Sequence, residues 1–80
     1  MKLLNLTIAR VDGPVFTGDV VSVALPGTDG DLELFANHEP FISPLRGGDI
    51  RIKKADGEVS TVTISSGTIE VSNNHATVLI

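Results

Sequence analysis

Apolar and polar residues alternate with a period of two along most of this chain. Such alternation is typical of β-strands that bury one face, because successive side chains of a strand point to opposite sides. No window keeps a helical period for more than about two turns. The positions expected to face a core are Leu4, Leu6, Ile8, Val21, Val23, Leu25, Leu32, Leu34, Ile50, Ile52, Val62, Ile64, Ile69 and Val71.

Turn-forming residues separate the alternating segments. Residues 26–30 and the pair Asn73-Asn74 predict turns, and Asp56-Gly57 predicts a hairpin closed by a two-residue primed turn. Residues 41–45 are expected to form a short strand, which Pro44 confines to a sheet edge or a bulge. Short strands with turns between them indicate an all-β domain.

The composition favours the same fold class. Valine, isoleucine and threonine supply 23 of the 80 residues, and their branched side chains fit a pleated sheet. We therefore predict an all-β fold in one domain over residues 1–80. It should be a small β-sandwich or flattened barrel of about 8–10 short, mostly antiparallel strands, without a C-terminal helical hairpin.

Charge and residue usage exclude several classes of function. The formal net charge is −4, which argues against a nucleic-acid partner because phosphate binding needs clustered lysine and arginine. The chain has no cysteine, so neither a disulfide nor a thiolate metal site is expected. No apolar run is long enough for a transmembrane helix or a signal peptide, so we expect no direct insertion into a membrane.

The stretch FANHEPFIS contains the most unusual candidate chemistry, because it places His38 beside Glu39. The two side chains could act as a general acid–base pair, or as metal ligands with His75 or Asp31 as the third. Neighbours in an extended segment point apart, however, and no nucleophile or cofactor motif accompanies them. The preferred interpretation is a loop histidine whose ring packs and forms hydrogen bonds.

The acidic turn at residues 28–31 has carboxylates that could bind calcium. Calcium needs about six oxygen ligands, and only Asp29, Asp31 and Glu33 keep the alternating spacing. A solvated turn is the preferred interpretation, and a charged contact with a partner is the second. We predict no catalytic residue, no bound cofactor and no metal, so this chain is expected to act through its contacts with other proteins.

The segments GDLELFANHEPFISPLRGGDIRI and SSGTIEVSNNHATVL resemble the N-terminal β-sandwich of the epsilon subunit of F-type ATP synthase, called delta in mitochondria. The likeness spans nearly all 80 residues and keeps the spacing. Ala36-Asn37 stands where the family usually has Pro-Gly, and asparagine tolerates positive φ. The matching positions are Val15-Phe16-Thr17-Gly18, Gly30-Asp31-Leu32, His38, Pro40, Arg46, Gly48, Ile50-Arg51-Ile52, Gly67, Glu70-Val71 and Thr77-Val78-Leu79.

The resemblance implies a non-catalytic rotor subunit that links the gamma subunit to the c-ring and couples proton flow to ATP synthesis. It implies a peripheral location on the F1 sector, at the cytoplasmic face of the bacterial plasma membrane. The family's C-terminal helices have no counterpart here, so the chain is either naturally short or truncated, and no ATP binding is expected. The alternative is a free-standing β-sandwich module that binds a protein or a ligand.

The resemblance also assigns candidate contacts. A rotor subunit with two neighbours needs a surface for each of them. The residues expected to face the c-ring are Thr28, Asp29, Gly30 and Asp31, and those expected near gamma or the ring-facing end are His38, Glu39, Pro40 and Phe41.

Overall fold

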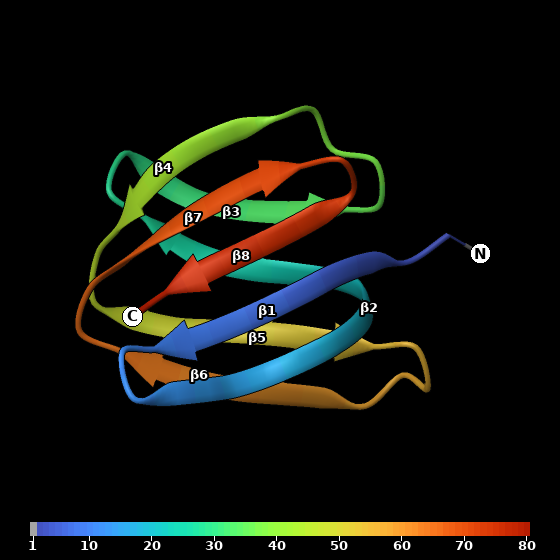
Figure 1. Cartoon of the computed structure of the whole chain (residues 1–80), viewed down its shortest axis with the longest axis horizontal. Coiled ribbons are helices and arrows are strands. Elements are labelled where there is room, and N and C mark those ends of the chain that lie inside the picture. The colour runs from blue at the N-terminus through green and yellow to red at the C-terminus, as the bar shows by residue number, and fades with distance from the viewer. Residues whose placement is uncertain (1) are drawn as a thin grey trace.

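The computed structural model describes residues 2–80 and confirms the predicted all-β fold (Figure 1). Among these residues no helix forms, so the described part of the chain contains no helix that could span a membrane. Eight strands follow one another along the chain, a number within the predicted range. They are β1 (Leu4–Arg10), β2 (Gly13–Gly27), β3 (Gly30–Phe35), β4 (Phe41–Leu45), β5 (Gly48–Lys54), β6 (Val59–Ile64), β7 (Gly67–Ser72) and β8 (His75–Leu79).

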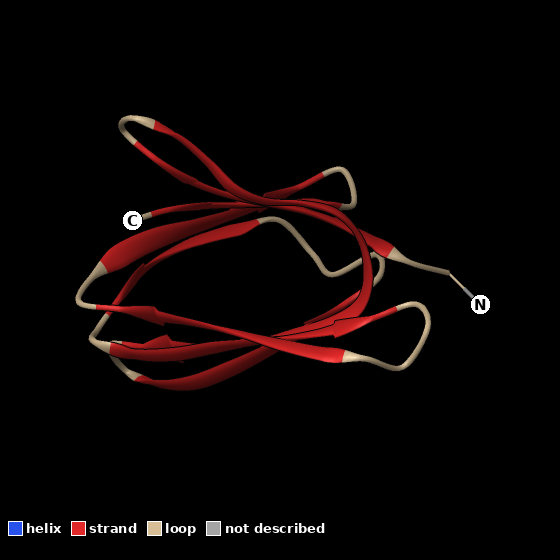
Figure 2. Cartoon of the chain, turned by 90° about the horizontal axis from the view of Figure 1, so that it is seen from below, coloured by secondary structure: helices blue, strands red, loops and turns tan. Residues whose placement is uncertain are grey.

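The strands form one hydrogen-bonded sheet that folds into two layers (Figure 2). One layer contains the first half of β2, then β1, β8, β7 and β4, and the other contains β3, the second half of β2, β5 and β6. Among the described strand pairs only β1 and β8 run parallel, as expected for a mostly antiparallel sandwich. Strand β4 pairs with β7 along its whole length and with β2 at the single pair Leu45–Gly27. Pro44 therefore lies in an edge strand whose other side is nearly open, as predicted.

Strand β2 joins the two layers, and its bend corrects one predicted face. Its register against β5 shifts between Val20 and Ser22, which leaves Val21 as the extra residue of a β-bulge. An extra residue reverses the alternation, so Val20 is fully buried before the bulge and Val23 after it. The expectation that Val21 faces the core is therefore wrong, since this side chain is only partly buried.

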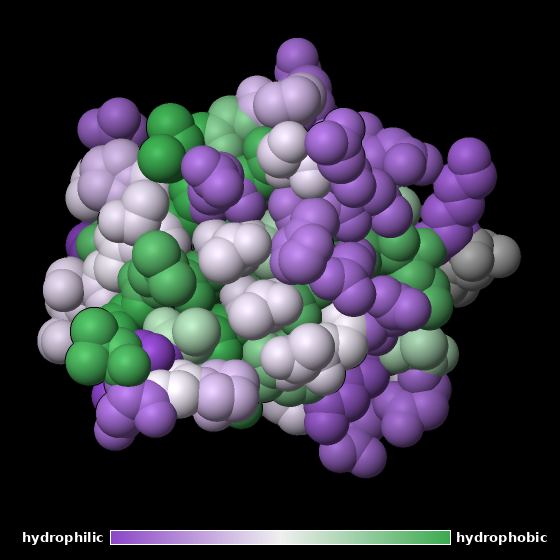
Figure 3. All heavy atoms as spheres, viewed as in Figure 1, coloured by the Kyte–Doolittle hydropathy of each residue, from purple (hydrophilic) through white to green (hydrophobic). Residues whose placement is uncertain are grey.

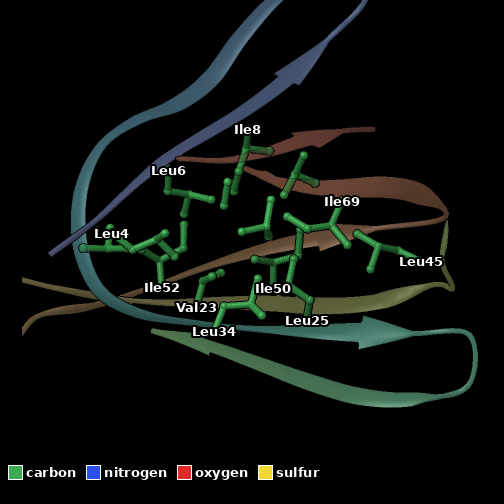
Figure 4. Packing of buried hydrophobic residues seen from close by; sticks show 14 of the residues in the cluster. Leu4, Leu6, Ile8, Val23, Leu25, Leu34, Leu45, Ile50, Ile52 and Ile69 are labelled. Carbon is green, nitrogen blue, oxygen red and sulfur yellow. The ribbon is translucent and has the colours of Figure 1, made fainter. Parts of the chain in front are cut away.

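The core lies between the layers and contains most of the positions predicted from alternation (Figure 4). Leu32 and Val62 are partly buried and pack against the edge of this cluster. Protein interiors are close-packed, so such a core makes a stiff body. The buried apolar residues are Leu4, Leu6, Ile8, Val20, Val23, Leu25, Leu34, Leu45, Ile50, Ile52, Ile64, Ile69, Val71, Ala76 and Val78.

The primed two-residue turn lies in a different hairpin from the one predicted. Asn73 and Asn74 both have positive φ, 52° and 60°, which makes the two-residue turn between β7 and β8 the primed one. In the β5–β6 hairpin, only Gly57 has positive φ, and its N–H donates to the Lys54 carbonyl at 2.9 Å. This hairpin was predicted correctly, but its turn has three residues and ends in a glycine bulge.

Candidate functional site

The acidic turn, residues 28–31, closes the hairpin of β2 and β3 at one end of the sandwich (Figure 1). Gly27 and Gly30 pair across its base. The Thr28 N–H donates to the Pro44 carbonyl at 3.3 Å, which ties the turn to β4. Every residue of the acidic turn is exposed, so its polar groups can reach a neighbouring molecule.

One carboxylate of the acidic turn is held in an ion pair. Asp31 Oδ1 accepts a hydrogen bond from the Arg46 guanidinium at 2.6 Å. Asp29 lies at the tip of the turn, and Glu33 is exposed further along β3. Within residues 2–80 no group of three or more acidic or histidine side chains is placed to hold a metal ion. The contact with Arg46 favours the interpretation of a solvated, charged turn.

The elbow, residues 36–40, connects β3 to β4 at the opposite end of the sandwich. The His38 Nδ1 donates to the backbone carbonyl of Glu39 at 2.8 Å, because a carbonyl oxygen can only accept. The His38 ring centroid lies 5.1 Å from that of Phe41. These contacts confirm a loop histidine that packs and forms hydrogen bonds. His38 is bonded to the backbone of Glu39 and not to its carboxylate.

The structure does not bring together the residues considered for a metal site with His38. His75 lies on β8, where its Nε2 is 3.4 Å from Thr7 Oγ1. Asp31 lies in the acidic turn, bound to Arg46. The histidine metal site is therefore not supported by the placement of its proposed third ligands.

The acidic turn and the elbow lie at opposite ends of the molecule, on the left and right of Figure 1. The β4–β5 connection lies at the same end as the acidic turn, and the β7–β8 turn lies at the same end as the elbow. The longest dimension of the chain is 31 Å. A rigid body of this shape can present the two ends to different neighbours at the same time.

A third surface is the outer face of the layer formed by β1, β8, β7 and β4, which we call the threonine face. Strand registers place its residues in rows across these strands. In Figure 3 residues of intermediate hydropathy cover its middle. Its side chains are Asn5, Thr7, Ala9, Ile42, Pro44, Thr68, Glu70, Ser72, His75, Thr77 and Leu79.

The threonine face has few charges. The chain contains 10 acidic and 6 basic residues, yet among residues 2–80 Glu70 is the only one of them on the outer face of these four strands. Asp19 of β2 borders the face, where it accepts a hydrogen bond from the Asn5 side chain at 3.0 Å. Ile42 and Leu79 are 67% and 58% exposed on it. By contrast, the outer face of the other layer has the charged side chains of Glu33, Arg51 and Lys53. Depletion of charge is typical of the centre of a protein–protein interface, so the threonine face is a candidate docking surface.

A shallow depression of about 380 Å³ joins the elbow to the threonine face. It is lined by Pro40 and Phe41 from the elbow side and by Ile42 and Glu70 from the threonine face, among others. The two surfaces are therefore continuous. Together they form one broad, mostly uncharged region.

Sequence reasoning identified the acidic turn and the elbow but missed the threonine face. A signal was present, because the positions that alternate with the buried residues of β1, β7 and β8 include one charged residue, Glu70, and are otherwise uncharged or histidine. Recognising one face from this signal requires knowing that these strands are neighbours. That neighbourhood depends on the parallel pairing of β1 with β8, which joins the two ends of the chain.

Comparisons with known sequences identify the family of this chain. A family model described as ATP synthase, Delta/Epsilon chain, beta-sandwich domain matches residues 3–80. The ATP synthase epsilon chain of Bacillus subtilis is 38% identical over 79 residues, which are 99% of this chain and 59% of that protein. The epsilon chain of Nitratiruptor is 38% identical over 80 residues and is covered to 62%. The chain thus spans about three fifths of the length of these relatives.

Solved structures share the fold. A chain of the Euglena gracilis mitochondrial ATP synthase, in an OSCP/F1/c-ring structure, aligns with a TM-score of 0.90 and 20% identity over 96% of this chain and 49% of its own. A chain of the Tetrahymena thermophila mitochondrial ATP synthase central stalk and c-ring aligns with a TM-score of 0.79 and 11% identity, over 94% of this chain and 60% of its own. Together with the family match over residues 3–80, the architecture shows that this chain belongs to the β-sandwich domain family of ATP synthase delta and epsilon chains.

Proposed function

We propose that this chain is the β-sandwich of a non-catalytic rotor subunit of a proton-translocating F-type ATP synthase, where it links gamma to the c-ring. The observation that carries the proposal is the family match over residues 3–80. In this role the chain turns with its neighbours and transmits torque, and it performs no chemistry of its own. It is a peripheral part of the F1 sector, at the cytoplasmic face of the bacterial plasma membrane.

Torque transmission requires a body that does not deform when its two ends are loaded. The two-layered fold supports this role, because its core is close-packed and β2 runs through both layers. Strand β2 also ends at the acidic turn, so a force on this turn acts directly on the longest strand of the sandwich.

We assign the two partners to different surfaces. The threonine face and the elbow form the gamma-binding surface, because they are continuous and poor in charge. The acidic turn faces the polar loops of the c-ring, where basic side chains can pair with Asp29. The placement of the elbow and the acidic turn at opposite ends supports this division, because one bridging body must keep its two contacts apart.

Replacing Thr68 by glutamate is expected to lower the affinity for purified gamma by about tenfold. Thr68 lies between Pro44 and Leu79 on the threonine face, and a carboxylate there would have to lose its water on binding. Isothermal titration calorimetry measures the affinity directly. The matched control is Thr61→Glu, because Thr61 is also an exposed strand threonine but lies in β6, in the other layer. An equal loss in both variants would show that the threonine face is not the gamma surface.

Replacing Asp29 by lysine is expected to weaken association with the isolated c-ring by several-fold at low salt. The reason is that repulsion replaces attraction at the tip of the acidic turn, and salt should remove most of the difference because the site is exposed. Co-sedimentation with reconstituted c-ring at two salt concentrations measures this effect. Asp56→Lys, the same charge change in the β5–β6 turn, is the control. If Asp29→Lys binds the ring as the unaltered chain does, the electrostatic contact is wrong.

A further inference from the structure

One side chain joins three segments at the elbow end of the sandwich. Asn74 is partly buried in the β7–β8 turn. Its Oδ1 accepts a hydrogen bond from the Asn37 backbone N–H at 2.7 Å, and its Nδ2 donates to the Leu3 carbonyl at 2.9 Å. Its own carbonyl accepts from the Asn5 N–H at 3.2 Å. Asn74 therefore connects the elbow to the N-terminal segment.

The hydrogen bond from Asn37 holds the elbow at its residue of positive φ. Asn37 has a φ of 63°, a left-handed conformation that residues other than glycine adopt only rarely. The hydrogen bond between His38 and the Glu39 carbonyl stays within the elbow, whereas that of Asn37 reaches another segment of the chain. The conformation of the elbow is thus coupled to the β7–β8 turn through the side chain of Asn74.

We propose that Asn74 is the positioning residue of the elbow, which its side-chain amide holds in the conformation that binds gamma. The inference rests on the function proposed above. An elbow that is already ordered loses less conformational entropy when a partner binds. Asn74 has no contact with the partner in this account. It acts through Asn37, and thereby through His38 and Phe41, which follow along the chain.

The substitution Asn74→Gly tests the proposal. Glycine adopts a φ near the observed 60° without strain, so the primed turn is kept while both side-chain hydrogen bonds are removed. We expect hydrogen exchange at the Asn37 N–H to become about tenfold faster, the factor that corresponds to one net hydrogen bond. The affinity for purified gamma should fall several-fold, with the rest of the exchange pattern preserved.

Two further variants make the test specific. Asn73→Gly is the matched control: Asn73 has a φ of 52° and is exposed, and in the described part of the chain its side chain forms no hydrogen bond. We expect it to change neither Asn37 exchange nor gamma affinity. Asn74→Asp keeps an acceptor for Asn37 but cannot donate to Leu3. Its second carboxylate oxygen faces the Leu3 carbonyl, which is also an acceptor, so the variant should restore only part of the Asn37 protection and of the gamma affinity that Asn74→Gly loses.

Each outcome decides one part of the proposal. Unchanged exchange at Asn37 in Asn74→Gly overturns the positioning role, whether or not gamma binds. Faster exchange with unchanged gamma affinity overturns the link between the elbow and the partner. If the unaltered chain does not bind gamma, the proposed function fails instead, and the exchange measurement still decides whether Asn74 positions the elbow.

Discussion

Replacing Ile52 by alanine is expected to lower the free energy of unfolding by about 2–5 kcal/mol. Ile52 lies in the middle of β5, is 0% exposed and pairs with Val23 in the core. Alanine removes buried methyl and methylene groups and leaves a cavity that a close-packed core fills only in part. Small domains are marginally stable, so a loss of this size is a large share of the total.

Urea denaturation followed by far-ultraviolet circular dichroism measures this loss, since the chain has no tryptophan or tyrosine to serve as a fluorescent probe. The matched control is Ile42→Ala, in which the same atoms are removed from a strand isoleucine that is 67% exposed. That variant should change the free energy of unfolding by less than about 0.5 kcal/mol. Similar losses in the two variants would contradict the assignment of Ile52 to the core.

Replacing Gly27 by alanine is expected to cost about 1–3 kcal/mol of stability and to distort the acidic turn. A Cβ atom at Gly27 would stand 2.5 Å from the Gly30 carbonyl oxygen and 3.1 Å from Leu32 Cγ. The Gly30 oxygen belongs to the backbone, so it can move away only if the hairpin opens. This close approach explains why a glycine lies immediately before the acidic turn, which is the surface proposed to contact the c-ring.

The control for this prediction is Gly18→Ala, also in β2. A Cβ atom there would meet Phe16 Cζ at 3.6 Å, an ordinary contact. We expect its stability to stay within about 1 kcal/mol of the unaltered chain. Thermal unfolding shows the difference in stability, and the amide chemical shifts of residues 28–31 show the distortion. A Gly27→Ala variant with native stability and unshifted turn resonances would rule out the tight hairpin base.

Much of the fold follows from patterns that the sequence contains locally. Alternation located all the segments that became strands in the second half of the chain, because single-faced burial determines which side of each strand is apolar. The bulge at Val21 could not be seen, since Val20, Val21 and Val23 fit either phase of alternation. The hairpin at Asp56-Gly57 was found, but its turn type depends on backbone geometry that the two residues alone do not determine.

The candidate site was predictable only in part, because it depends on contacts between distant segments. The acidic turn and the elbow were found from their residues, and the short strand β3 between them already separates them. The contacts that hold them, Asp31 with Arg46 and Asn37 with Asn74, span 15 and 37 positions in the chain. The threonine face was missed for the same reason, because it forms only when β1 pairs with β8.

In the proposed function, one rigid body binds two partners through separate surfaces. The most direct test measures the unaltered chain, Thr68→Glu and Asp29→Lys, each against purified gamma and against the isolated c-ring. We expect micromolar or tighter binding of the unaltered chain to gamma. Thr68→Glu should lose affinity for gamma alone, and Asp29→Lys should lose affinity for the ring alone. No binding of the unaltered chain to gamma, or equal losses for both partners in either variant, would contradict the proposed function.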